Sequence, residues 1–319
     1  MRSTCKHAFV SICMSAMLTG CAGLSSPPSA ASGAERAAAA SSPVRVDAST
    51  GPEVFVSTAA GSVDFYSARG RPVGSVAFHT SPGQTIYGGL AIDASKDLYV
   101  GVVKNVDVLP APYKVQQATL DGSGQGFDGL AVDRQTGLVA GANFHCCQNS
   151  NIVIWKAGDA TPCKRLSNDD TYGIFGVAFD AEHDLFVTAV DRDGAAHIFE
   201  VYGGCNAKGF QELSFSNHIA NIGGIQINAA DQPVVSDDSG NLFTYDRPSG
   251  GSLGAPIETT TVSDGFRKFA LTADGKAVWI IGQTSVAEYS YPSGGSPIAY
   301  ISKTEGAQED IDIATAPLP

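Results

Sequence analysis

Gly129-Leu130-Ala131-Val132-Asp133 is the stretch that decides the fold, because close copies of it recur along the chain. Residues 89–93 read Gly-Leu-Ala-Ile-Asp and residues 176–180 read Gly-Val-Ala-Phe-Asp, while weaker copies begin at Gly224 and Lys268. In each copy a short apolar segment ends in Asp, Asn or Thr, and a turn leads into a second apolar segment. Repeats of 40 to 48 residues are typical of propellers and solenoids.

Short apolar segments separated by Gly-rich turns predict an all-β class. The first expected strands, over 54–57 and 62–66, have no copy of the repeat in front of them, but residues 310–314 read Asp-Ile-Asp-Ile-Ala and supply a strand at the other end of the chain. Pairing 310–314 with 54–57 closes a ring and removes the exposed sheet edge. The sequence therefore predicts a six-bladed β-propeller over 51–319, closed by pairing the C-terminal strand with the N-terminal blade.

The amino terminus has the composition of an export leader. Arg2 and Lys6 are basic, and the apolar stretch over 8–18 is too short to span a bilayer. The stretch 18–21 reads Leu-Thr-Gly-Cys, which resembles a bacterial lipobox, in which the leader is removed before the Cys and the thiol is diacylated. We expect a lipoprotein signal peptide over 1–20 and lipidation of Cys21; an ordinary secretory signal with an incidental Cys is the alternative.

Residues 21–50 are rich in Ala, Ser, Pro and Gly, a composition that buries no core and that predicts a disordered tether. Ala22 follows Cys21, in place of the Asp that retains lipoproteins in an inner membrane. The expected location is the cell envelope, lipid-anchored, and the outer membrane if the cell has two. The net charge of −12 has no basic stripe to offset it, which argues against a nucleic-acid partner.

The Gly-[Leu/Val/Ile]-Ala-aliphatic-Asp strand, with the aliphatic-aromatic-Val strand after it, resembles the NHL-repeat and gluconolactonase-like (senescence-marker-like) six-bladed propellers over about residues 52–314. Such relatives include lactonases, streptogramin-type lyases and plain interaction modules. The resemblance therefore implies a fold rather than an activity.

In this architecture one rim of the ring carries the loops that enter the innermost strands and those that leave the second strands, and ligands are expected there. Gluconolactonase-like relatives hold a central metal with Glu, Asn and Asp, and the resemblance implies four metal-ligating positions here: Asn143, Asp191, Asp237 and Glu309. Such oxygen ligands suit Ca²⁺, the one cofactor expected. Asp191 and Asp237 also begin Asp-x-x-Gly turns, where Asp serves as a turn former without any ligand.

Four cysteines remain in the exported part, and their positions favour one pairing. Cys163 and Cys205 fall in outer turns of adjacent blades, whereas Cys146 and Cys147 fall in a loop at the opposite rim. A strand of five residues separates the rims by about 16 Å, beyond the reach of a disulfide. We expect Cys163–Cys205, with Cys146 and Cys147 either bonded to each other or reduced. A folded-back loop over 143–151 would pair differently, and a Zn²⁺ site is a further alternative.

The sequence shows no convergent catalytic set. Residues 250–254 match the hydrolase pattern Gly-x-Ser-x-Gly, but they lie in a Gly/Ser-rich turn instead of between a strand and a helix. We expect a membrane-anchored envelope lipoprotein whose propeller is a non-catalytic binding or interaction module for an unidentified protein, peptide or small molecule. The alternative is a metal-dependent lactonase or lyase with a cation at the channel mouth.

Overall fold

The structure is a computed structural model that describes residues 52–58, 61–78, 88–102, 104–122, 126–143, 150–168, 171–263, 268–282, 285–301 and 310–316. The predicted leader, Cys21 and the predicted tether lie outside these residues, as do Cys146, Cys147 and Glu309. Within the described part of the chain, no helix has the length and apolar character that crossing a membrane requires.

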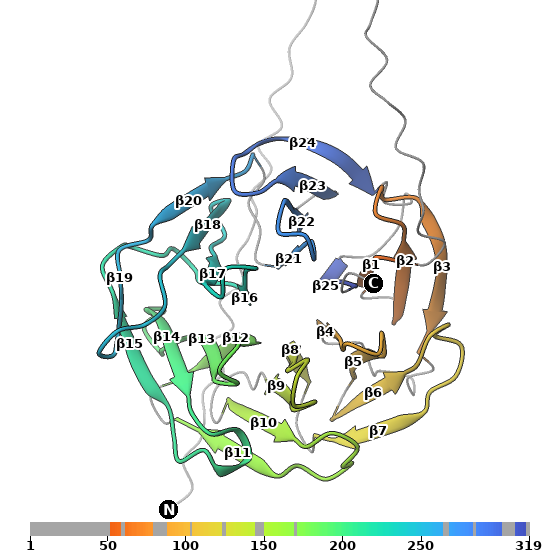
Figure 1. Cartoon of the computed structure of the whole chain (residues 1–319), viewed down its shortest axis with the longest axis horizontal. Helices are drawn as coiled ribbons and strands as arrows, with labels where there is room; N and C mark the ends of the chain where they lie inside the picture. The colour runs from red at the N-terminus through yellow and green to blue at the C-terminus, as the bar shows by residue number, and fades with distance from the viewer. Residues whose placement is uncertain are drawn as a thin grey trace, which may run out of the picture. The chain divides into compact units, whose positions relative to one another are not determined.

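Six antiparallel sheets stand around a central axis, and we number them as blades 1 to 6 (Figure 1). The strands of the first three blades, from the innermost outward, are β25 (Asp310–Thr315), β1 (Val54–Thr58), β2 (Ser62–Tyr66) and β3 (Pro72–Ala77); β4 (Gly88–Ile92), β5 (Leu98–Val102), β6 (Asn105–Leu109) and β7 (Ala118–Asp121); and β8 (Phe127–Val132), β9 (Val139–Asn143), β10 (Asn151–Trp155) and β11 (Lys164–Ser167).

The strands of the other three blades are β12 (Gly173–Phe179), β13 (Leu185–Val190), β14 (Ala196–Val201) and β15 (Gln211–Phe215); β16 (Ile225–Ile227), β17 (Pro233–Ser236), β18 (Asn241–Thr244) and β20 (Glu258–Thr261); and β21 (Phe269–Leu271), β22 (Ala277–Ile281), β23 (Val286–Ser290) and β24 (Gly294–Ile301). A short 3₁₀-helix, η1 (Gly204–Asn206), lies between β14 and β15. All five copies of the repeat found in the sequence form or lead into innermost strands, which confirms the predicted all-β propeller.

The two ends of the described chain share one sheet, as predicted. β25 pairs antiparallel with β1, with Ala314 opposite Phe55 and Asp312 opposite Ser57. The backbone N–H of Asp312 also donates to Oγ of Ser57 at 3.0 Å. The closing strand runs one residue beyond the predicted segment, to Thr315.

The hydrophobic core lies between the blades, because both faces of each sheet pack against a neighbouring sheet. Between blades 2 and 3, for example, Val106 and Leu120 share a cluster with Phe127 and Trp155, all of them buried. Trp155 also donates its indole N–H to the carbonyl of Asp121 in blade 2, at 3.2 Å. This packing fixes the position of each innermost strand relative to the axis.

Blade 4 carries a fifth strand that the sequence did not predict. β19 (Ser252–Gly254) comes from the connection between β18 and β20 of blade 5 and pairs in parallel with β15. Leu253 is buried there. The Gly-x-Ser-x-Gly pattern over 250–254 thus extends a neighbouring sheet and covers its outer edge, a structural role that explains the segment without catalysis.

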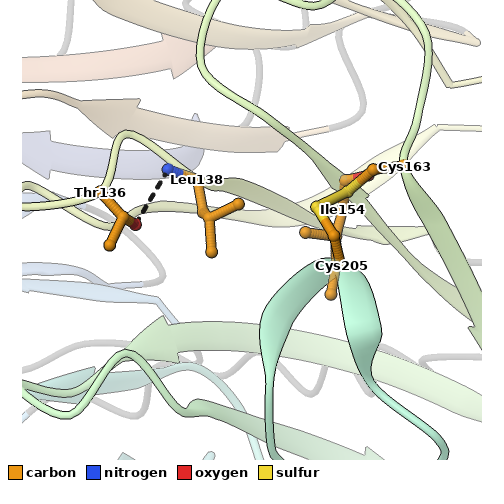
Figure 2. The surroundings of a disulfide bond; sticks show 5 residues. All are labelled: Thr136, Leu138, Ile154, Cys163 and Cys205. Atoms are coloured by element: carbon orange, nitrogen blue, oxygen red, sulfur yellow. Dashed lines mark hydrogen bonds between the residues drawn. A yellow bond between two sulfur atoms is a disulfide. The ribbon is translucent and has the colours of Figure 1, made fainter.

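A disulfide joins Cys163 of blade 3 to Cys205 in η1 of blade 4, with 5.4 Å between their Cα atoms (Figure 2). Cys163 is held by its backbone N–H, which donates to the carbonyl of Ile154 at 2.9 Å. This is the pairing favoured by the opposite-rim argument. The other two predicted partners, Cys146 and Cys147, lie outside the described residues.

Candidate functional site in the channel

At one equivalent position of the six innermost strands, the residue type changes from glycine in some blades to a charged residue in others. We call it the anchor position; in chain order it holds Gly89, Gly129, Gly176, Gly224, Lys268 and Asp312. The strand registers establish the equivalence, since Gly176 pairs with Thr188 in β13 as Asp312 pairs with Ser57 in β1. Four glycines, one cation and one anion therefore surround the axis at the same level.

Glycine is required here because neighbouring innermost strands approach closely. A Cβ atom on Gly176 would lie 2.8 Å from the backbone nitrogen of Ile225 in blade 5. A Cβ atom on Gly129 would lie 3.0 Å from the carbonyl oxygen of Phe175 in blade 4. Both separations are shorter than ordinary van der Waals contact, so the ring is narrow at this level.

Lys268 crosses this narrow level from blade 6 toward the opposite side of the ring. Its Nζ donates to the carbonyl oxygen of Phe175 at 2.6 Å and to that of Asp128. The Asp128 carboxylate lies 3.8 Å away, and the lysine side chain is only 12% exposed. The ammonium therefore occupies the channel and ties blade 6 to blades 3 and 4.

Asp312 is the buried anion at the same level. Its Oδ2 accepts the backbone N–H of Leu90 in blade 2 at 2.8 Å, and its Oδ1 accepts that of Ile313 at 2.9 Å. Burial raises the pKa of Asp312 to about 6, although Lys268 and the two N–H groups act in the opposite direction. The carboxylate thus ties blade 1 to blade 2.

Two more polar side chains bond the inner edges of the strands. Gln226 in blade 5 donates to the carbonyl of Phe269 at 2.9 Å and accepts the N–H of Leu271 at 2.8 Å, both in blade 6. Thr315 in blade 1 donates to the carbonyl of Leu271 at 2.6 Å. The polar departures from the repeat fall in blades 5, 6 and 1, where they satisfy backbone groups that face the axis.

A cavity of about 380 Å³ lies along the axis. Residues of the innermost strands form its wall, among them Leu90, Leu130, Val177, Ile225 and Leu271, and more of the exposed wall is polar than apolar. The wall begins directly after the anchor position and ends at the turns between the first and second strands, which we call the turn rim. The inner end of the cavity therefore lies next to the level of Lys268.

This is the opposite end of the channel from the rim predicted as the ligand site. Most loops of the predicted rim, such as 79–87, 144–149 and 302–309, lie outside the described residues. The prediction for that rim therefore stays a prediction. Sequence reasoning missed the turn rim because it read the Asp and Asn residues there as turn formers.

Three carboxylates line the cavity at the turn rim, and each already has partners. Asp180 and Asp231 both face Arg247 of blade 5, at 3.0 Å and 3.2 Å. Asp133 lies 2.8 Å from Nδ1 of His183. The same carboxylates also accept backbone N–H groups of their own or the adjacent turn, such as that of Ala181 to Asp231 at 2.8 Å.

Arg134 is the cation that lines the cavity among the described residues. Its side chain is exposed at the turn rim, and within the described part of the chain it has no hydrogen bond and no ion pair within 4.0 Å. Although the side chain is exposed, desolvation by neighbouring protein groups lowers the pKa of Arg134, and the charge of Asp93 opposes this lowering. The guanidinium thus carries donors that no described residue accepts.

An acidic group adjoins the cavity in blade 4. Asp180, Asp184 and Glu200 each place a carboxylate oxygen within 4.8 Å of the others. Burial, with the neighbouring negative charges, raises the pKa of Asp184 and of Glu200; the hydroxyl of Tyr202, which donates to Glu200, acts in the opposite direction on Glu200. These oxygens could hold a cation. The sequence did not reveal the group because Glu200 lies within β14, outside the repeat.

Of the predicted metal ligands, the structure describes three. Asp191 and Asp237 each cap their own turn: Asp191 accepts the N–H groups of residues 193 and 195, and Asp237 those of residues 239 and 241. The N–H of Ala195 is the main cause that lowers the pKa of Asp191. Asn143 donates to the side chain of Asn151 at 3.4 Å. Glu309 lies outside the described residues, so the set of four stays a prediction.

Comparisons with known proteins show the fold. No family model matches the chain, and no curated protein matches it. A chain of the nidogen/laminin complex aligns over 83% of this chain and 98% of its own length, with a TM-score of 0.63 and 16% identity. A chain of Kuenenia stuttgartiensis hydrazine synthase aligns over 79% and 99%, with a TM-score of 0.55 and 12% identity. At such identities the likeness supports a six-bladed β-propeller and no particular activity.

Proposed function

We propose that the protein is a lipid-anchored component of a bacterial cell envelope whose propeller binds a partner or ligand without catalysing a reaction. The observation that carries the binding role is the cavity of about 380 Å³ on the axis of a closed ring. More of its exposed wall is polar than apolar, and its carboxylates mainly bond neighbouring turns and blades, an arrangement suited to holding a ligand.

Three further observations support the proposal. The Cys163–Cys205 bond fits an exported protein, because disulfides persist in oxidising compartments. The similar chain in the nidogen/laminin complex belongs to an assembly of proteins, so the same fold serves there within an interaction partner. The lipobox-like stretch before Cys21 supports the anchor.

The anchor is tested by expressing the full chain in a diderm bacterium fed with an alkyne-tagged fatty acid. We expect the wild-type chain to carry the tag and to fractionate with membranes, and Cys21→Ser to carry none. An untagged wild-type chain that is secreted or soluble would refute the anchor and would leave the binding role standing.

The binding role is tested by photo-cross-linking in intact cells. A photoreactive side chain replaces Gln135, which is exposed where the cavity opens, or Arg192, which is exposed in the turn after β13 on the opposite rim. We expect a discrete adduct from position 135 and a weaker or different one from 192. Identical background labelling at both positions would contradict a binding site at the turn rim.

A second candidate, a metal-dependent lactonase or lyase, is favoured by the acidic group, since Asp180 both belongs to it and lines the cavity. A bound cation would polarise a substrate carbonyl. Saturating Ca²⁺, Mn²⁺ or Zn²⁺ should then raise the melting temperature. Loss of this rise in Glu200→Gln would assign the metal to the acidic group, and loss in Asp237→Asn to the set implied by the gluconolactonase-like resemblance. No rise with any metal would remove this candidate.

A further inference from the structure

We infer that the oxygen atoms around Lys268 form a cation site on the axis, which the chain fills with its own ammonium group in place of a metal ion. The inference concerns the anchor level of the channel and depends neither on the lipid anchor nor on the binding role. It follows from three features of this level: the backbone that faces the ammonium, the carboxylates beside it, and the close approach of the strands around it.

The two carbonyl groups that accept hydrogen bonds from Lys268 belong to β-bulges. The register of β8 against β9 shifts at Asp128, and that of β12 against β13 shifts at Phe175. A bulge takes its extra residue out of the ladder of hydrogen bonds between the strands. Both carbonyl oxygens accept from Nζ of Lys268, that of Phe175 at 2.6 Å. Carbonyl oxygens that converge in this way are typical ligands of a hard cation.

Two carboxylates accompany these carbonyl groups. The carboxylate of Asp128 lies 3.8 Å from Nζ of Lys268, and Asp312 is the buried anion of the same level. Burial is the main cause that raises the pKa of Asp312; the charge of Asp128 adds to this effect, and the charge of Lys268 opposes it. The two anions therefore disfavour each other, and the ammonium relieves both of them.

The strands hold the ammonium in a place that backbone surrounds. Gly129 and Gly176 lie at the anchor level, where a Cβ atom would press on the backbone of the next blade. The side chain of Lys268 is only 12% exposed. An ion bound from solution would leave such a site as its concentration fell, whereas an ammonium on a side chain stays. The arrangement of these innermost strands thus does not depend on cations in the medium.

The test removes the built-in cation and offers one from solution. Lys268→Ala deletes the outer part of the side chain with its ammonium, and n-propylammonium reproduces the deleted part. The axial cavity, whose inner end lies next to this level, gives a small amine a path. Melting temperatures of the full chain are measured at pH 8, above the pKa of about 6 of Asp312. Propanol is the uncharged analogue, and tetramethylammonium is a cation without N–H donors.

Propylammonium should raise the melting temperature of Lys268→Ala by about 2–4 °C at about ten times its dissociation constant, and should leave the wild type unchanged. Propanol and tetramethylammonium should raise neither. Ca²⁺ should raise the melting temperature of Lys268→Ala beyond any rise of the wild type, because oxygen ligands suit it. Lys276→Ala, which removes an exposed lysine from a turn of the same blade, should respond to every additive as the wild type does.

Adding Asp128→Asn or Asp312→Asn to Lys268→Ala should weaken the response to propylammonium, since each change removes one negative charge from the site. If Lys268→Ala does not fold alone, its recovery from urea with and without propylammonium is the measurement, and recovery only with the amine is expected.

Three results would overturn the inference: equal responses of Lys268→Ala and wild type, a rise with propanol as large as that with propylammonium, or no effect of any cation on Lys268→Ala. None of them bears on the cross-link at position 135, so the proposed function is judged separately.

Discussion

Lys268 and Asp312 occupy the anchor position in adjacent blades, and the ammonium of the first favours the ionised form of the second. The other four blades hold Gly at this position, and at Gly89, Gly129 and Gly176 a Cβ atom would contact the next blade. The pair therefore places two opposite charges in a layer that is otherwise bare backbone. Lys268 bonds to the inner edges of blades 3 and 4, across the axis from blade 6, whereas Asp312 bonds to the inner edge of the adjacent blade 2.

Replacing Lys268 with Met should destabilise the protein more at pH 8 than at pH 5. Asp312 already has a pKa of about 6, above its ordinary value, so the folded state binds its proton more tightly than the unfolded chain. The associated stability is present at low pH and is lost as the pH rises through about 6. Without Lys268 the pKa of Asp312 rises further, which makes ionisation more costly. We expect the free energy of unfolding to fall by roughly 1–3 kcal/mol more at pH 8 than at pH 5.

Thermal or urea denaturation at several pH values measures this difference. Loss of the bonds from Lys268 to the carbonyls of Asp128 and Phe175 lowers stability at every pH and does not mimic the effect. In Lys268→Met/Asp312→Asn the additional pH dependence should disappear. A destabilisation by Lys268→Met that is equal at pH 5 and pH 8 would show that the two charges do not interact.

Gly176→Ala should destabilise the ring by about 1–3 kcal/mol, because the added methyl group would press on the backbone of Ile225 and force two innermost strands apart. Gly209→Ala is the matched control, since a Cβ atom there meets nothing within 4 Å. Urea titration of both variants measures the difference. Equal stability of the two would mean that the anchor level is not closely packed.

The fold was predictable from the sequence because the pattern of residues that forms each innermost strand repeats along the chain. The repeat that begins at Gly129 returns at a steady spacing, and the strand missing in front of residues 54–57 stands at 310–314. A propeller requires both features, and neither depends on which side chains meet across the axis.

The channel was not predictable in the same way. Lys268 bonds to carbonyl groups that lie 93 and 140 residues away, and no local spacing reports such a contact. In the sequence Gln226 and Lys268 weaken two copies of the repeat, and that was the available signal. In such a copy of the repeat the strand is kept, but the residue at one position that faces the axis is changed. Such a change marks a residue with a role at the axis. Asp191 and Asp237, by contrast, do in the structure what any turn-forming Asp does.

Removing the disulfide should lower the free energy of unfolding by about 3–4 kcal/mol, the loop-closure value for a separation of 42 residues. Cys163→Ala/Cys205→Ala in denaturant, compared with wild type, measures the loss, and reduced wild type should resemble the variant. Cys146→Ala/Cys147→Ala should cost far less, since a bond between adjacent residues closes almost no loop. A larger loss from the second pair would support the alternative pairing through the loop over 143–151.

Glu288→Gln should stabilise the protein at pH 8 and do so much less at pH 5. Burial on β23, helped by the charge of Asp274, raises the pKa of Glu288 to about 7. The folded state therefore favours the protonated form, and the ionisation penalty grows as the pH rises from the ordinary value of 4.5 to about 7. Gln removes that penalty; because the side chain is only half-buried, we expect a gain of about 1 kcal/mol at pH 8. Melting curves at both pH values measure the gain, with Glu258→Gln on the exposed strand β20 as the control. A Glu288→Gln variant with the same melting temperature as wild type at pH 8 would show that Glu288 carries no ionisation penalty.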